Sequence, residues 1–404
     1  MAVGNIEFPL MHAVSGVKLG TACAGIKQTE RDDLLLIEMA EGATCAAVFT
    51  QNAFCAAPVT VAKDHLSKQP RYLLINSGNA NAGTGEQGMA DAELSCVEVA
   101  QLAQVGAEQV LPFSTGVIGE ALPIIKIVDT LPKAQENLVE DNWLKAAHAI
   151  MTTDTFAKGY SKVIEIDGCA VTITGISKGA GMIQPNMATM LGFIATDATI
   201  SQQNLQQCLS VAVEQSFNRI TVDGDTSTND ACVLMASGAS SLPEIMPGTD
   251  TMGAFQLAVQ EACMFLAEAI IRDGEGATKL IKIKVQQASS DAEAVEVAKT
   301  IAHSPLVKTA FFANDPNWGR ILAAIGRSGV DQLDVKKISI YLGEVCIVEK
   351  GGRASSYTEA AGQKIMDQQE ITVTVVLGRG EQEQQVLTCD FSYDYVRINA
   401  EYRT

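Results

Sequence analysis

Two segments near the middle of the chain have the apolar spacing of amphipathic helices. Between residues 204 and 217, apolar side chains recur every three or four positions. They are Leu205, Cys208, Leu209, Ala212 and Val213. The second set consists of Phe255, Val259, Ala262, Leu266 and Ala269. We expect the Asp273-Gly274 pair to end this second helix, because glycine tolerates the left-handed conformation of a helix C-terminus.

Alternating patterns predict strands on both sides of these helices. Ile281, Ile283 and Val285 alternate with lysines, the signature of a half-buried strand. Residues 163–166 and 170–174 are rich in β-branched side chains. Asp167-Gly168 between them favours the positive φ angles of a tight hairpin, whose second strand runs toward Lys178. Strands that alternate with helices predict a layered α/β fold.

The length of 404 residues favours two domains. No repeat and no Pro-rich or Ser-rich linker divides the chain, so we expect the domains to pack closely. We place a larger α/β domain at residues 1–280 and a smaller C-terminal α/β domain at 281–404. The final segment, FSYDYVRINAEY, is rich in aromatic and β-branched residues, which predicts a docked terminal strand whose end reaches the active site.

The net charge of −18 argues against phosphate backbones and anionic lipid surfaces as partners. The first residues lack a basic segment followed by an apolar run, and no stretch approaches 18 consecutive apolar residues. We therefore expect a cytoplasmic protein that binds neither nucleic acid nor membrane.

The sequence predicts no metal site. Ten cysteines are scattered without a CxxC pair, which favours reduced and mostly buried thiols. The four histidines are isolated, and His148 shares a predicted apolar helical face with Leu144, Ala147 and Met151, so we expect it to pack in the core. The acidic segment TVDGDTSTND at 221–230 lacks the glutamate that closes a calcium loop, and we interpret it as a turn-rich segment near the active site.

A hydroxyl nucleophile could instead be activated by its own α-amine. An N-terminal threonine has an amine with a pKa of about 8, which can accept the hydroxyl proton. Thr189 gains such an amine if the bond after Ala188 breaks, and its own hydroxyl can attack the Ala188 carbonyl. Gly179, Gly181 and Pro185 precede it and allow or restrain unusual backbone angles. From these residues alone, an ordinary strand threonine remains the commoner alternative.

The segment KGAGMIQPNMATMLGFIATD at 178–197 resembles the cleavage motif of the ornithine acetyltransferase family, also called glutamate N-acetyltransferase. Further motifs resemble that family in order along essentially the whole chain. They are NSGNANAGTG (76–85), STGVIGE (114–120), MTTDT (151–155), TVDGDTSTND (221–230), DGEGATK (273–279), DPNWGR (315–320) and YVRINAEYRT (395–404). The chain departs from the family pattern at Gly83, Ala157 and Glu401.

The resemblance implies a layered sandwich with an active site like that of N-terminal-nucleophile enzymes. It implies that Thr189 is the nucleophile, that the chain cuts itself between Ala188 and Thr189, and that Thr115 and Gly116 form the oxyanion hole. Without the resemblance, STGVIG would be interpreted as a plain turn after a strand around 110–113. The implied substrate-binding residues are Thr155, Lys178, Thr189, Glu275, Asn399 and Thr404. Lys178 and Glu275 would otherwise be interpreted as solvated surface charges.

The implied reaction moves the acetyl group of N2-acetyl-L-ornithine through Thr189 to L-glutamate, in arginine biosynthesis. No bound cofactor is implied, although acetyl-CoA is a further possible substrate, and the family suggests a heterotetramer of two α and two β chains. Two alternatives remain open. A self-processing aminopeptidase or amidase would pass the acyl group to water, and a noncatalytic binding protein would keep the fold without maturing.

Overall fold

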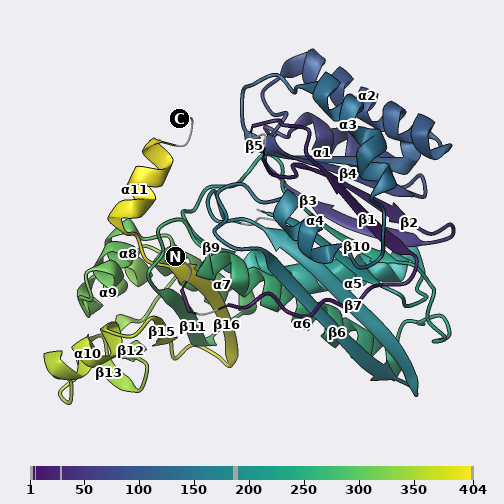
Figure 1. The fold of residues 1–404 in the computed structure, drawn as a ribbon. Coiled ribbons are helices and arrows are strands. Elements are labelled where there is room, and N and C mark those ends of the chain that lie inside the picture. Colours follow the sequence, from purple (N-terminus) through teal and green to yellow (C-terminus); the bar gives the residue numbers. More distant parts are fainter. Residues whose placement is uncertain (1–2, 5, 28–29, 185–189, 402–404) are drawn as a thin grey trace.

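The computed structural model describes residues 3–4, 6–27, 30–184 and 190–401. Three β-sheets and their helices build the molecule, in an α/β arrangement as the strand and helix patterns predict. Two of the sheets pack face to face in the N-terminal part, and the third lies beside them with most of the C-terminal part (Figure 1).

The first sheet has four strands in the order β1-β2-β4-β5. Their bounds are Val17–Ala22, Leu34–Met39, Tyr72–Asn79 and Val110–Val117. Only β4 and β5 are parallel in this sheet. Three helices cover its outer face through an apolar cluster: α1 (Ala57–His65), α2 (Gly85–Ala103) and α3 (Ile124–Glu136) (Figure 1).

The second sheet has five strands in the order β3-β10-β8-β7-β6. Their bounds are Thr44–Phe49, Ala231–Ala236, Leu191–Thr196, Cys169–Lys178 and Lys158–Ile166. Its outer face packs on α5 (Gln202–Gln215) and α6 (Asp250–Arg272). Its inner face packs on the first sheet and on α4 (Trp143–Ala149), so the layers follow the order helix, sheet, sheet, helix.

The third sheet has seven strands in the order β14-β13-β12-β15-β11-β16-β9. Their bounds are Gly352–Arg353, Val345–Glu349, Ser339–Leu342, Glu370–Val376, Leu280–Ala288, Gln382–Cys389 and Ile220–Thr221. Four helices lie with it: α7 (Asp291–Ala302), α8 (Pro305–Phe312), α9 (Trp318–Gly326) and α10 (Glu359–Met366). Because β9 comes from the N-terminal part, the two parts share one sheet edge. The domain boundary at residue 280 stays a prediction.

Most periodic segments form the predicted elements. The two amphipathic patterns are α5 and α6, and the alternating segment is β11, whose Ile281, Ile283 and Val285 are buried. Strands β6 and β7 form the predicted hairpin, with φ of 50° at Asp167 and 76° at Gly168. Helix α6 ends at Arg272 as expected, but Gly276 rather than Gly274 has the positive φ, of 69°.

The predicted terminal strand is wrong, because Tyr393–Ala400 forms the helix α11. The Ser392 hydroxyl caps this helix by accepting hydrogen bonds from the backbone N–H groups of Asp394 and Tyr395. The rings of Phe391 and Tyr395, four residues apart, stack at 4.6 Å. Capping and this packing override the strand propensity of the aromatic and β-branched residues.

The core position predicted for His148 is also wrong. His148 is exposed, and Leu144 on the same face is 47% exposed. The buried face of α4 instead carries Trp143, Ala146 and Ala147. The large indole of Trp143 sets the rotation of this short helix, because its burial removes more apolar surface from water than burial of the imidazole would.

The ten cysteines are free, and six of them are buried, in agreement with the expected reduced thiols. Among the described helices, α6 is the one long and apolar enough to cross a membrane by length and composition. Its buried residues, however, pack on the second sheet and on α5, as expected of a core helix.

Candidate active site

A pocket of about 280 Å³ opens where strand ends of the two face-to-face sheets meet. The ends of β4, β5 and β7, the start of β8 and the segment before β10 all contribute to its wall. The loop after α6 and the helix α11 complete it. The polar side chains in the wall are Thr115, Thr152, Thr153, Lys178, Ser227, Asn229, Asp230, Glu275 and Asn399.

Thr115 and Gly116 lie in the last part of β5 rather than in a separate turn. Gly116 has φ of 139°, and its register with Gly78 of β4 is followed by an irregularity. A Cβ at Gly116 would lie 2.3 Å from the Gly78 carbonyl carbon, so no side chain fits there. Both residues of the predicted oxyanion hole therefore face the pocket from a distorted strand end.

Asn229 fixes the position of this strand end. Its Nδ2 donates to the carbonyl oxygens of Ala80 at 2.5 Å and Ser114 at 3.0 Å. The side chain is 5% exposed. One buried amide thus joins the ends of β4 and β5 to the segment before β10, and it holds the backbone next to Thr115 in place.

Lys178 and Glu275 also line the pocket, so their interpretation as solvated surface charges is wrong. Lys178 ends β7 and donates from Nζ to the Thr115 hydroxyl oxygen at 3.2 Å. Glu275 is 7% exposed, and its Oε2 accepts a hydrogen bond from Asn399 Nδ2 at 2.8 Å. A Cβ at Gly181 would lie 2.4 Å from the Glu275 carboxylate, so glycine at 181 makes room for it.

Opposing influences act on the pKa of the Glu275 carboxyl. Burial raises its pKa, and the negative charge of Asp223 raises it further, whereas hydrogen bonds from Thr153 and Asn399 and the charge of Lys178 act in the opposite direction. No salt bridge involves Glu275 among the described residues. The Glu275 carboxyl is therefore easier to protonate than the carboxyl of an exposed glutamate.

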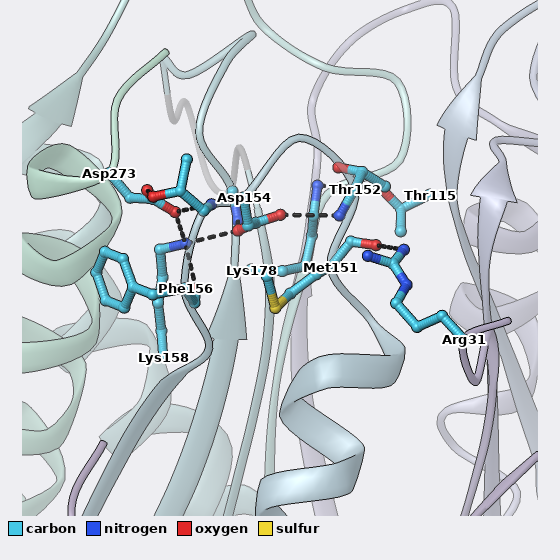
Figure 2. Close-up of polar contacts among 11 residues, drawn as sticks. Arg31, Thr115, Met151, Thr152, Asp154, Phe156, Lys158, Lys178 and Asp273 are labelled. Carbon is cyan, nitrogen blue, oxygen red and sulfur yellow. Dashed lines mark hydrogen bonds and ion pairs between the residues drawn. The ribbon is translucent and has the colours of Figure 1, made fainter. Parts of the chain in front are cut away.

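Behind the pocket lies a buried cluster of Asp154, Lys158 and Asp273 (Figure 2). Lys158 Nζ contacts a carboxylate oxygen of each aspartate at 2.6 Å, and all three side chains are at most 1% exposed. Asp154 also accepts hydrogen bonds from the backbone N–H groups of Thr152 at 2.9 Å and Gly179 at 2.7 Å. The cluster therefore ties the loop after α4 to the glycine-rich loop after β7.

Charge in this cluster is unevenly shared. Burial alone would raise the pKa of Asp154, but Lys158, Lys178 and the Gly179 N–H hold it well below its usual range. Burial raises the pKa of Asp273 despite its contact with Lys158. Asp154 is thus the ionised partner of Lys158, and Asp273 completes the network.

Thr155 lies at this cluster and not in the wall of the pocket. Its hydroxyl and its backbone N–H both donate to the Asp273 carboxylate, and its side chain is otherwise exposed. Among the predicted site residues, Thr115, Gly116, Lys178, Glu275 and Asn399 come together in the pocket. Ala188, Thr189 and Thr404 lie outside the described residues. Met190, the residue after Thr189, lines the pocket.

Asp230 was not singled out from the sequence, although it belongs to the acidic segment that we expected near the site. It is 5% exposed and lines the pocket, and its buried Oδ2 lacks a hydrogen-bond partner among the described residues. Burial raises its pKa well above the usual range. The neighbouring Asp223 accepts the backbone N–H groups of Met182 at 2.7 Å and Ile183 at 2.9 Å, which positions the loop before the predicted cleavage site. The only sequence signal for Asp223 or Asp230 was the number of acidic residues in the segment 221–230.

In the described part of the chain, no group of three or more His, Cys, Asp or Glu side chains is arranged to hold a metal ion. The polar side chains that line the pocket carry hydroxyl, carboxyl, amide and ammonium groups. An oxyanion site next to an ammonium group suits acyl transfer.

Comparisons with known proteins identify the family of this chain. The model of the ArgJ family matches residues 18–404. The arginine biosynthesis bifunctional protein ArgJ of Methylococcus capsulatus is 63% identical over 97% of this chain and 96% of its own length. The protein of that name from Pseudomonas fluorescens is 55% identical over 100% of both chains. A solved ArgJ chain from Bacillus halodurans is 43% identical and covers 52% of this chain and 97% of its own, with a TM-score of 0.50. Because the family model spans nearly the whole sequence, this chain belongs to the ArgJ family.

Proposed function

We propose that this enzyme transfers the acetyl group of N2-acetyl-L-ornithine to L-glutamate through an ester on Thr189, releasing L-ornithine and N-acetyl-L-glutamate. The observation that carries the proposal is the single pocket that brings the Thr115–Gly116 strand end, Lys178 and the Glu275–Asn399 pair together beside Met190. The names of the relatives place them in arginine biosynthesis, the pathway to which we assign this reaction.

Each wall of the pocket suits one part of the substrates. Lys178 contacts Thr115, so an α-carboxylate bound by its ammonium group lies close to the oxyanion site, where the α-amine must exchange the acetyl group. The Glu275–Asn399 pair then faces the other end of the substrate, the side chain. The Thr115–Gly116 strand end stabilises the negative oxygen that forms when the acetyl carbonyl is attacked, an interaction whose loss costs about 10² to 10³ in rate.

The nucleophile requires that the chain be cut between Ala188 and Thr189, which frees the Thr189 amine as its base. Residues 189–404 make up 216 of 404 residues, about 53% of the chain. The solved chain from Bacillus halodurans covers 52% of this chain, the share expected of one product of such a cut. We assign the mature enzyme as a cytoplasmic heterotetramer of two α and two β chains, with no bound cofactor.

Acetyl-CoA is a second acetyl donor in this proposal. The relatives from Methylococcus capsulatus and Pseudomonas fluorescens are named bifunctional. A thioester can acylate the same threonine hydroxyl, and the acetyl-enzyme then serves both donors.

Acetyl transfer is tested with purified enzyme, N2-acetyl-L-ornithine and L-glutamate. We expect ornithine and N-acetylglutamate in equal amounts, and denaturing mass spectrometry should find two chains that meet at 188/189. Thr189→Ala should remain one intact and inactive chain, whereas Thr189→Ser keeps the hydroxyl and serves as the matched variant. Release of acetate without glutamate, at the same rate, would identify an amidase. An intact chain without turnover would identify a binding protein.

A further inference from the structure

Asp230 is a buried acid in the wall of the active-site pocket, and the proposed function gives it no role. The residue is 5% exposed and lines the pocket together with Lys178 and Met190. Its Oδ2 is buried and has no hydrogen-bond partner within the described parts of the chain. A buried polar atom without a partner costs free energy, so an acid kept in this state points to a function.

The backbone of Asp230 is fixed by the strands on either side of it. Its carbonyl oxygen accepts the backbone N–H of Thr50, which follows β3, at 2.9 Å. The N–H of Ala231, which begins β10, donates to the Met190 carbonyl oxygen at 2.9 Å. Because β10 and β8 are parallel with Ala231 opposite Leu191, Asp230 lies level with Met190. The carboxyl is therefore held at the end of an interior strand, beside the residue that follows Thr189.

The surroundings of Asp230 favour an acid that carries its proton in the free enzyme. Burial raises the pKa of Asp230 well above the usual range, while hydrogen bonds from Ser227 and the positive charge of Lys178 act in the opposite direction. Among the described residues, Lys178 is the charged group that acts on this pKa. Near neutral pH, such a carboxyl gives up and takes back a proton more readily than an ordinary aspartate, as general acid–base catalysis requires.

The proposed reaction needs a proton at the substrate nitrogen as well as at the threonine oxygen. The hydroxyl proton of Thr189 goes to the Thr189 amine. The leaving nitrogen needs another, because it carries one hydrogen in the amide and two in the free amine of ornithine. In the proposed function Lys178 binds the α-carboxylate, and this nitrogen is attached to the same carbon atom. The nitrogen is thus expected near Asp230, on which the charge of Lys178 already acts.

We propose that Asp230 is the general acid and base for the substrate nitrogen, a role that rests on the proposed function. In the first half-reaction the ester C–O bond to Thr189 forms, the C–N bond of acetylornithine breaks, and the Asp230 carboxyl gives its proton to the leaving nitrogen. Asp230 is then a carboxylate, and the Thr189 amine is an ammonium group. In the second half-reaction the free amine of glutamate attacks the ester, Asp230 takes the proton of that nitrogen, and the Thr189 oxygen leaves with the ammonium proton.

Two acetyl donors distinguish the loss of this acid from a general defect of the pocket. Acetylornithine loses an amine that needs a proton, whereas p-nitrophenyl acetate loses a stable phenolate that needs none. In Asp230→Asn, single-turnover acetylation by acetylornithine should slow about 10² to 10⁴-fold, the usual contribution of a general acid. Acetylation by p-nitrophenyl acetate should stay within about threefold of the wild type, because asparagine has nearly the shape of aspartate.

The second half-reaction is measured on enzyme acetylated by p-nitrophenyl acetate. Transfer from this acetyl-enzyme to glutamate should also slow about 10² to 10⁴-fold in Asp230→Asn. Asp230→Glu keeps a carboxyl and should recover part of both lost steps. Asp225→Asn is the matched control, because Asp225 is an exposed acid of the same segment and lies outside the described lining of the pocket. Denaturing mass spectrometry shows which variants are cut at 188/189.

The pH dependence of the wild type gives a readout that needs no variant. With acetylornithine, kcat/KM should fall as the pH rises through the pKa of Asp230, because the acid is then lost. With p-nitrophenyl acetate, kcat/KM should not fall there. Glu275, whose pKa is also raised, acts in the opposite sense, because its ionised form attracts the side-chain ammonium group of acetylornithine.

The outcomes separate this role from the proposed function. If Asp230→Asn slows acetylation by both donors equally, or by neither, the role of Asp230 is wrong and the proposed function stands. Wild-type profiles that fall at the same pH with both donors would also overturn the role, and they decide the question if Asp230→Asn remains uncut. A wild-type enzyme that transfers no acetyl group from acetylornithine to glutamate would overturn the proposed function itself.

Discussion

In the proposed reaction, the Glu275 carboxyl must accommodate two substrates whose side chains carry opposite charges. Ornithine ends in an ammonium group and glutamate in a carboxylate, yet one pocket holds both in turn. An ionised Glu275 attracts the first, and a protonated Glu275 can donate a hydrogen bond to the second. Because burial already raises the pKa of this carboxyl, protonating it costs less free energy than protonating an exposed glutamate. Lys178 and Asp223 are the charged groups that act on it.

Proton exchange on binding tests this role of Glu275. Glutamate binding should take up protons, increasingly as the pH rises, because Glu275 is then ionised in more of the free enzyme. Ornithine binding should release protons, increasingly as the pH falls. Titration calorimetry in two buffers of different ionisation enthalpy counts them. Glu275→Gln should abolish both signals and weaken ornithine about tenfold or more relative to glutamate. Unchanged proton counts in this variant would refute the assignment.

Asp230 is a buried acid that weakens the fold when it ionises. Its pKa is raised by burial, so its contribution to stability is present at low pH and is lost as the pH rises through the folded-state pKa. Asp230→Asn cannot ionise. We expect its melting temperature to exceed that of the wild type increasingly as the pH rises above about 4, the ordinary pKa of an aspartate in the unfolded chain.

The same variant should lose activity, because Asp230 lines the pocket with an unpartnered oxygen. A site that keeps such a group trades stability for function. Asp331→Asn, on an exposed loop, is the matched control. A stability difference that is constant with pH would show that the pKa of Asp230 is the same in the folded and unfolded chain, and would contradict the raised pKa.

Lys158 shows how an element depends on one buried charge. It begins β6 and bridges Asp154 and Asp273, which belong to two different loops. Lys158→Met leaves both carboxylates buried without a cation, so unfolding in urea should require about 3 to 5 kcal/mol less free energy. Lys162 lies on the same strand and pairs with Glu261, with both side chains about half exposed. Lys162→Met should therefore cost about 0 to 1 kcal/mol.

A further change separates charge from packing at Lys158. Adding Asp273→Asn to Lys158→Met removes one of the two unpaired carboxylates and should recover part of the lost stability. If Lys158→Met and Lys162→Met destabilise the protein equally, the cluster does not hold the loops together.

The spacing of apolar residues predicted the helices and strands that bury one face. It failed where a single local contact determines the secondary structure or the rotation of a helix. The spacing of Leu205 and Leu209, or of Ile281 and Ile283, reports burial directly, so α5 and β11 followed from the sequence. The Ser392 cap makes the segment of α11 a helix rather than a strand, and the burial of Trp143 determines which face of α4 is buried. Neither the cap nor the burial of one large side chain produces a repeating pattern of apolar residues in the sequence.

The site residues also fall into those that the sequence predicted and those that it did not. The motifs that resemble the family contain Thr115, Lys178, Glu275 and Asn399, which the structure gathers in one pocket. The pairing of Lys158 with Asp273 joins residues that are 115 positions apart in the sequence, and no local pattern predicts it. The roles of Thr189 and Thr404 stay predictions.

At the scale of the whole molecule, the pocket exists only because distant parts of the chain meet. Both face-to-face sheets supply strand ends, and α11 brings Asn399 from the far end of the sequence to Glu275. Figure 1 shows α11 reaching up from the C-terminal part, beyond its sheet. We infer that one pocket assembled in this way serves both amino acids in turn, so the proposed reaction binds its two substrates in sequence.

Kinetics can test this sequence of binding. Initial rates at several fixed glutamate concentrations should give parallel double-reciprocal lines against N2-acetylornithine, because ornithine leaves before glutamate enters. Acetylornithine alone should release ornithine in an amount limited by the number of active sites. The chain that begins at Thr189 should gain the mass of one acetyl group. Thr189→Ala, which stays uncut, should show neither. Intersecting lines, with no ornithine released until glutamate is added, would require both amino acids to bind together. A neighbouring cavity of about 210 Å³, which shares Gly116 with the wall of the active-site pocket, would then be the place to look for the other amino-acid site.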